Sequence, residues 1–222
     1  MVLSTCRTHL TSPGRRLIQA SRPTGGRVAR SGCGPPYKPI GTNLTGLLAS
    51  YAGFFAEALE LPPEFFDRKI DNHISQLRIM HYPPPEAAPL PGQLRAGAHS
   101  DLGMMTLLYS DNDIGGLEVM NRAGRWVPVP VIDDAFTVNL GDLMMRWTND
   151  RWRSTLHRVV NPPAAANDLS RRLSIGMFFI PNYDAVVAPI AGGGDISRYP
   201  PITVADYRTS RFASTASHAG AE

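Results

Sequence analysis

Residues 96–108, AGAHSDLGMMTLL, decide how the rest of the chain is interpreted, because a histidine and an aspartate here stand two residues apart. Successive side chains of an extended segment point to opposite faces, so His99 and Asp101 project to one side, about 7 Å apart along the strand. An apolar run follows directly, which places the pair where a strand enters a core. One imidazole and one carboxylate on the same face are half of a metal site.

The third ligand of such a site has to come from far along the sequence. Of the six histidines, two lie in the terminal segments and His73 lies in a polar connection. His157 stands in the strand-like segment STLHRVV and is a better candidate than His81. With His99 and Asp101 it would make a set of two imidazoles and one carboxylate, which holds non-haem Fe(II) and leaves three coordination positions open.

The histidine–aspartate pair has a second interpretation, because such residues are more often hydrogen-bonded partners than metal ligands. Arg172 and Ser174, in RRLSIGMFF, favour the metal interpretation. Their spacing places a guanidinium beside a hydroxyl on an otherwise apolar strand, where a buried arginine is costly unless a carboxylate pairs with it. The carboxylate of a ligand would match the planar guanidinium. The alternative is that Arg171 and Arg172 both lie on the surface.

The composition is typical of a globular, β-rich protein with many turns. Of the 222 residues, 18% are charged and 43% are hydrophobic, and glycine and proline number 20 each. This length is enough for one domain with a large core. The longest apolar runs fall short of the roughly 18 residues that a membrane span needs, so we expect no membrane partner.

The excess of positive charge belongs to residues 1–40, which hold seven of the 22 basic residues and none of the 19 acidic ones. The remaining 15 basic and 19 acidic residues leave the rest of the chain acidic. It lacks a basic stripe interleaved with aromatic residues, so we expect no nucleic-acid partner.

Residues 1–40 also contain both cysteines, which argues against a disulfide-based fold and fits either a reducing compartment such as the cytoplasm or indifference to redox conditions. The absence of periodicity predicts a disordered basic tail. Its arginine- and serine-rich composition would also suit an organelle transit peptide or a wrongly assigned start.

Helical spacing of apolar residues predicts a helix over 44–59, ended by the prolines at 62 and 63, and a short helical turn follows from 63. A strand is expected at 75–82. Short strands at turn-punctuated intervals then predict an antiparallel sandwich or barrel. They are expected at 104–110, 116–120, 126–131, 136–140, 155–160, 172–180 and 185–188. A short helix is expected at 204–207. The single domain would run from 41 to 212, followed by a disordered tail at 213–222.

Four motifs occur in order along the chain: HSD at 99–101, VNLGDLM at 138–144, WTNDRWRSTLHRVV at 147–160, and RLS at 172–174 followed by MFFIP. Together they resemble the iron- and 2-oxoglutarate-dependent dioxygenases of the isopenicillin N synthase-like superfamily, from about residue 44 to about residue 212. The resemblance implies a mainly β fold, the double-stranded β-helix or jelly roll, with a few flanking helices.

The resemblance also implies a function, the oxidation of a small organic metabolite by hydroxylation, desaturation or cyclisation, with release of succinate and carbon dioxide. Fe(II), 2-oxoglutarate and dioxygen would take part, and ascorbate is a further candidate. The implied iron ligands are His99, Asp101 and His157. Arg172 and Ser174 would grip the distal carboxylate of 2-oxoglutarate, and Tyr82 would add a hydroxyl. Many plant relatives have an asparagine two residues before that tyrosine, where this chain has Met80.

The expected departure from the family is at the front, where members usually begin with about a hundred residues that cover one side of the barrel. Residues 1–40 do not resemble that region. We therefore expect an uncovered sheet edge that favours self-association or instability, and a metal-binding core with reduced or absent turnover in isolation. Two other functions stay open: an iron oxidase of the same fold that does not use 2-oxoglutarate, and a non-catalytic module that holds zinc or another divalent ion.

Overall fold

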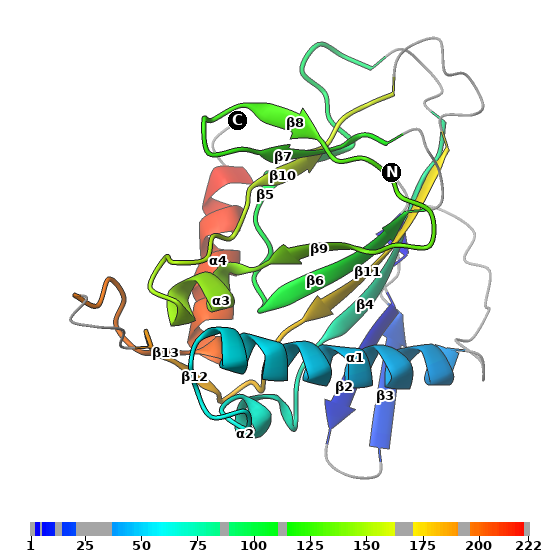
Figure 1. Cartoon of the computed structure of the whole chain (residues 1–222). Helices are drawn as coiled ribbons and strands as arrows, with labels where there is room; N and C mark the ends of the chain where they lie inside the picture. The colour runs from blue at the N-terminus through cyan, green and yellow to red at the C-terminus, as the bar shows by residue number, and fades with distance from the viewer. Residues whose placement is uncertain are drawn as a thin grey trace.

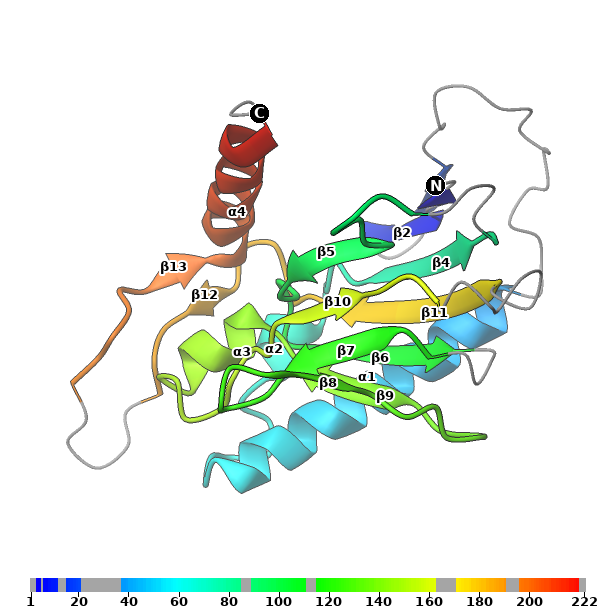
Figure 2. The same ribbon diagram turned by 90° about the horizontal axis from the view of Figure 1, so that it is seen from above.

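The computed structural model describes the main chain of residues 3–4, 6–11, 15–20, 37–84, 89–110, 115–162, 171–190 and 196–219, and the side chains between residues 44 and 213 of those ranges. Two antiparallel sheets face each other and form a sandwich (Figure 1). The view from above shows the smaller sheet lying over the larger one (Figure 2). Residues 111–114 and 191–195 lie outside the described residues.

The larger sheet has five strands in the order β1-β4-β11-β6-β9. These are β1 (Leu3–Ser4), β4 (Gln76–Tyr82), β11 (Arg172–Phe179), β6 (Met105–Ser110) and β9 (Thr137–Leu140). The smaller sheet has four strands in the order β5-β10-β7-β8. These are β5 (Ala96–His99), β10 (His157–Val159), β7 (Leu117–Met120) and β8 (Trp126–Pro128).

From β4 to β11 the chain passes back and forth between the two sheets. Strands β4, β6, β9 and β11 belong to the larger sheet, and the strands between them belong to the smaller one. This alternation, with antiparallel pairing throughout both sheets, is the winding of a jelly roll. The mainly β fold predicted from the sequence is therefore confirmed.

Alternation along β11 separates two environments. Arg172, Ser174 and Phe178 share the face that looks into the sandwich, and Met177 and Phe179 point to the outer face. Helix α1 (Tyr37–Ala58) lies along that outer face (Figure 1). The buried side chains that meet there are Leu48, Ala52 and Ala56 of α1 and Leu77, Leu107, Met177 and Phe179 of the sheet. The helix thus completes the core on the side away from the site.

Helix α1 begins at Tyr37, earlier than the predicted start at residue 44, because the apolar spacing on which the prediction rests begins at Leu44. Complete burial of a side chain such as Leu48 contributes about 1.5–3 kcal/mol. The predicted turn after residue 63 leads into α2 (Asp67–Ile70). The described helices include none that is long and apolar enough to cross a membrane.

Two further helices lie at the end of the sandwich where β5 ends and β10 begins (Figure 1). Helix α3 (Asp142–Trp147) was not predicted from the sequence. It is one and a half turns long and buries four of its six residues, so it shows no amphipathic pattern. Helix α4 (Val204–Ala219) extends well beyond the predicted residues 204–207. It follows a small sheet of β12 (Val186–Val187) and β13 (Ile202–Thr203).

The first forty residues include short strands, and the disordered tail expected there stays a prediction. Besides β1, they contain a hairpin of β2 (Cys6–Thr11) and β3 (Arg15–Ala20). Strand β1 pairs antiparallel with β4 at Met80 and Ile79. An open sheet edge presents unpaired N–H and C=O groups, which explains why a short extended segment adds to it. The domain boundary at residue 41 stays a prediction.

Two glycines allow the loop after β5 to lie against neighbouring main chain. A Cβ atom added at Gly103 would lie 2.2 Å from the carbonyl oxygen of Phe179. One added at Gly141 would lie 2.2 Å from the carbonyl oxygen of Gly103. Met104, the residue after Gly103, donates its main-chain N–H to the carbonyl oxygen of Phe179 at 2.8 Å. The main chain of the loop that follows His99 therefore packs directly against the main chain of β11 and of the residue before α3.

Gly103→Ala is expected to lower the free energy of unfolding by about 3 kcal/mol, at the upper end of the cost of overpacking, because the added methyl meets backbone instead of a flexible side chain. Urea unfolding measures the loss. Gly97→Ala is the matched control, since a Cβ atom at Gly97 meets nothing within 4 Å and should change stability by less than about 0.5 kcal/mol. Equal stability of the two variants would contradict the close approach.

Candidate metal centre

Two histidines lie side by side at one end of the smaller sheet. His99 is the last residue of β5 and His157 is the first residue of β10, and the two are direct cross-strand partners. Their side chains therefore share a face of the sheet, and their ring centroids lie 4.3 Å apart. His157 also pairs with Val119 of β7, which fixes it from the other side.

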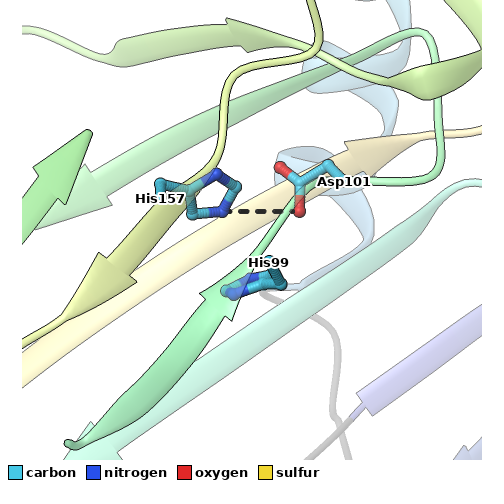
Figure 3. Close-up of side chains that lie close together, drawn as sticks. All are labelled: His99, Asp101 and His157. Carbon is cyan, nitrogen blue, oxygen red and sulfur yellow. Dashed lines mark ion pairs between the residues drawn. The ribbon is translucent and has the colours of Figure 1, made fainter. Parts of the chain in front are cut away.

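The carboxylate of Asp101 lies opposite the two rings and is almost fully buried (Figure 3). Its Oδ2 accepts hydrogen bonds from Thr106 Oγ1 at 2.6 Å and from Asn139 Nδ2 at 2.8 Å. Its Oδ1 faces His157, with 3.7 Å between Oδ1 and Nε2. Because both hydrogen bonds use Oδ2, Oδ1 is the atom that is oriented to bind a cation.

The hydrogen bonds of the two rings determine which nitrogen can act as a ligand. Nδ1 of His99 lies 2.8 Å from the carbonyl oxygen of Gly97, and Nδ1 of His157 lies 3.1 Å from that of Thr155. A carbonyl oxygen only accepts, so in the neutral rings each Nδ1 carries the hydrogen. Each Nε2 therefore keeps a lone pair for a metal, the arrangement in which the second ring nitrogen of a ligand is held by an acceptor.

Burial of its ring favours the neutral form of His99, which a metal ligand requires. Desolvation of the ring lowers the pKa of His99 below its ordinary value, although the residue as a whole is exposed at the end of β5. The hydrogen bond to Gly97 acts in the opposite direction, and positive charge on His157 would lower the pKa further. Proton competition for this nitrogen is thereby reduced.

The donor set fits a divalent metal ion. One ligand atom from each of His99, Asp101 and His157 can be chosen so that all lie within 4.8 Å of one another. Two imidazole nitrogens and one carboxylate oxygen suit Fe(II) and leave positions open on the metal. Three protein ligands would also suit a catalytic zinc ion. The structure thus brings together the three residues that the sequence singled out.

The second part of the site lies deeper between the sheets, around Arg172. This residue is 2% exposed, and its guanidinium donates to Ser174 Oγ at 3.1 Å and to Ser110 Oγ at 2.9 Å. Leu108 and Leu117, from facing sheets, line a cavity with Arg172. Arg172 is therefore an interior residue, and the alternative that it lies on the surface is wrong.

Tyr82 is the cross-strand partner of Arg172, and it is likewise buried. The guanidinium carbon lies 5.5 Å from the centre of its ring. The hydroxyl of Tyr82 donates to the sulfur of Met80 at 3.9 Å. Burial raises the pKa of Tyr82, although the charge of Arg172 opposes the rise. The phenol therefore stays a hydrogen-bond donor, and Met80 takes part in the site as a weak acceptor.

Sequence reasoning missed three polar residues of the site: Thr106, Ser110 and Asn139. Asn139 belongs to the motif VNLGDLM, which the sequence analysis noted without assigning a function to this residue. Thr106 and Ser110 lie on a strand that reads as core, and only the register of β6 with β11 reveals their partners. The rejected histidines lie elsewhere: His81 is exposed, and His73 is buried against Phe179 with its pKa lowered by burial.

Two histidines and one carboxylate that leave positions open on the metal are the donor set of a class of enzymes, the non-haem Fe(II) oxygenases. Residues 73–181 match the family model described as the 2OG-Fe(II) oxygenase superfamily. The chain belongs to this superfamily, which confirms the resemblance seen in the motifs. The description of the family gives its metal as Fe(II) and its co-substrate as 2-oxoglutarate.

Curated relatives match over a large part of this chain. The 2-oxoglutarate-Fe(II) type oxidoreductase hxnY of Emericella nidulans is 38% identical over 156 residues, which are 68% of this chain and 43% of the relative. Validamycin A dioxygenase of Streptomyces hygroscopicus subsp. limoneus is 34% identical over 157 residues, again 68% and 43%. The matched part of the chain therefore spans less than half the length of either relative.

Solved structures give the same fold. A full-length protein of Neurospora crassa, crystallised in complex with alpha-KG and 5-formyluracil, superposes with a TM-score of 0.72 and 31% sequence identity. The match covers 81% of this chain and 60% of the other.

Proposed function

We propose that this chain is the catalytic core of an oxygenase that uses Fe(II), 2-oxoglutarate and dioxygen to oxidise a small organic metabolite. One observation carries the proposal: the ligand cluster and the buried guanidinium of Arg172 face the same interior of one sandwich. We infer that Fe(II) is held by Nε2 of His99, Nε2 of His157 and Oδ1 of Asp101.

When bound, Fe(II) would supply open coordination positions for the 2-oxo acid and for dioxygen, and the redox chemistry that joins decarboxylation of the co-substrate to oxidation of the metabolite. The protein supplies positioning. Thr106 and Asn139 hold Oδ2 of Asp101, so the carboxylate presents one oxygen and does not take a second coordination position. The positions that remain open are those that the co-substrate and dioxygen need.

Arg172 is proposed to bind the distal carboxylate of 2-oxoglutarate. In the low dielectric between the sheets, attraction between opposite charges is much stronger than in water. The planar guanidinium can donate two parallel hydrogen bonds to a carboxylate. Ser174 and Ser110 hold the guanidinium in place, and the hydroxyl of Tyr82 is a further donor beside it. The co-substrate would therefore lie in one direction, with its 2-oxo acid end toward the histidines.

The reaction outcome, whether hydroxylation, desaturation or cyclisation, is set by how the metabolite lies beside the metal. A small organic substrate is supported by the names of the relatives, one of which is a validamycin A dioxygenase, and by the neighbour bound to 5-formyluracil. On the inner face, Phe178 offers a ring beside Thr106, whose hydroxyl contacts Asp101. We propose a flat or partly apolar metabolite at this ring, and ascorbate stays a further candidate.

We also propose that the protein acts in the cytoplasm and self-associates through the open side of its larger sheet. Strand β9 is an edge strand of that sheet, and its Val138 is exposed. Ile132 and Phe136, which precede it, are exposed as well, as is Phe54 of α1. Exposed apolar side chains beside an unpaired strand favour association.

Anaerobic titration of the protein with Fe(II) and then with 2-oxoglutarate tests the proposed activity. The expected result is a visible charge-transfer band that appears only when both are present, followed by succinate formation when air and a substrate are added. Uptake of iron without the band would support an oxidase that does not use 2-oxoglutarate. Failure to take up iron would support a non-catalytic module, and either result would overturn the proposal.

A further inference from the structure

The C-terminal helix contacts the residue that separates two of the proposed ligands. Arg211 of α4 lies 111 residues after Ser100, yet its Nη2 donates to Ser100 Oγ at 3.2 Å and lies 3.4 Å from the Ser100 carbonyl oxygen. Ser100 stands directly between His99 and Asp101. A displacement of Ser100 would therefore change the spacing of both neighbours.

The same guanidinium is anchored by a buried carboxylate. Nε of Arg211 lies 3.4 Å from Oδ2 of Asp142, which also accepts a hydrogen bond from the Tyr207 hydroxyl at 3.0 Å. The side chain of Asp142 is 4% exposed and that of Arg211 is 42% exposed, so solvent screens the ion pair from the arginine side only. Burial, with the negative charge and hydrogen bond of Asp142, raises the pKa of Tyr207 well above its ordinary value, so its hydroxyl stays protonated.

Asp142 is in turn bonded to the ligand segment through its main chain. The N–H of Asp142 donates to the carbonyl oxygen of Asp101 at 2.8 Å. The N–H of Leu143 donates to the carbonyl oxygen of Leu102 at 3.2 Å. Residues 100–104 have no helical or strand structure of their own. Contacts with α3 and β11 therefore position this segment, and Arg211 adds a contact at Ser100, between the two ligands.

We propose that Arg211 and Tyr207 are positioning residues, which act through Ser100 and Asp142 to set the spacing of His99 and Asp101 for the metal. The inference rests on the proposed metal centre and adds α4 to it. Partners that orient metal ligands usually change metal affinity by about 10- to 100-fold when they are removed. Arginine suits this role because its planar fork reaches the carboxylate and the hydroxyl together.

Mn(II) affinity of the full chain, measured by the electron paramagnetic resonance of unbound Mn(II), tests the inference without requiring turnover. Arg211→Met is expected to weaken binding by about 10- to 100-fold. Arg211→Lys keeps a charge near Asp142 but loses the fork, so an intermediate loss is expected. Tyr207→Phe removes a single hydroxyl and should weaken Mn(II) binding by several-fold with the fold intact.

Arg208→Met is the matched control, because it removes the same charge from the same helix at a residue whose guanidinium lies over Phe212. Its Mn(II) affinity should equal that of the unchanged protein. An equal loss in Arg208→Met would make the effect one of helix packing and overturn the inference. Unchanged affinity in both Arg211→Lys and Tyr207→Phe would overturn it even if Arg211→Met did not fold. If the unchanged protein did not bind Mn(II), the proposed metal centre would be overturned as well. Only this measurement on the unchanged protein tests the metal centre separately from the role of Arg211.

Discussion

Asp101→Asn is expected to weaken binding of Fe(II) or Mn(II) by more than about 100-fold and to reduce succinate formation to background. Loss of a partner that merely orients a ligand costs about 10- to 100-fold, so loss of an anionic ligand should cost more. Asparagine keeps the shape of the side chain and an oxygen that can accept from Thr106. The variant should therefore fold, and circular dichroism together with metal titration measures both properties.

Asp150→Asn is a suitable control for this change, since it removes the same charge from a carboxylate that bonds Arg198 and Tyr199. Its metal affinity should stay within about twofold of that of the unchanged protein, because it contacts none of the proposed ligands. If Asp101→Asn bound the metal as tightly as the control does, the ion would have to be held by other residues. The assignment of Oδ1 as a ligand would then fail.

Arg172→Met is expected to raise the KM for 2-oxoglutarate by about 30-fold or more while metal affinity stays unchanged. Removal of one partner from a buried, hydrogen-bonded charge pair costs about 2–5 kcal/mol, which corresponds to at least that factor. The variant should still fold, at a cost of about 1–3 kcal/mol, because the buried hydroxyls of Ser174 and Ser110 lose the guanidinium as a hydrogen-bond partner. Initial rates of succinate formation against 2-oxoglutarate concentration give the KM.

Arg171→Met controls for the loss of charge, because Arg171 directly precedes Arg172 and is exposed. Arg172→Lys adds a graded test: the ammonium retains the charge but lacks the two-pronged geometry, so its KM should lie between the two. A KM in Arg172→Met equal to that in Arg171→Met would remove Arg172 from the co-substrate site. The oxidase that does not use 2-oxoglutarate would then be the better interpretation.

Much of the sandwich could be predicted from the sequence because its strands are short, apolar and separated by clear turns. The turn at Asn121 is one example: its side-chain Oδ1 accepts from the main-chain N–H groups of Ala123 and Arg125, and Gly124 adopts a positive φ of 71°. Such local chemistry is visible without tertiary information. The grouping of the three ligands could be predicted because His99 ends β5 and Asp101 follows it two residues later, and because His157 stands in another strand-like segment.

Other parts of the site depend on contacts that no local pattern encodes. Thr106 and Ser110 lie among apolar residues on a strand that the sequence indicates is core. Their roles become visible only once the strand beside β6 is known. Asp142 is buried and paired with Arg211, a residue that reads as part of a polar C-terminal segment. The pairing of β1 with β4 likewise depends on an available sheet edge, which residues 1–40 alone do not reveal.

The division of the ligands between the two layers has a consequence for folding. His99 and His157 stand on the smaller sheet, and Asp101 is tied by Thr106 and Asn139 to β6 and β9 of the larger one. An ion held by all three would cross-link the layers. A ligand that binds only folded protein at about 100 times its Kd adds about 2.7 kcal/mol to the free energy of unfolding. Metal supply would then govern cellular abundance as well as turnover, since protein without the ion would open more often to proteases.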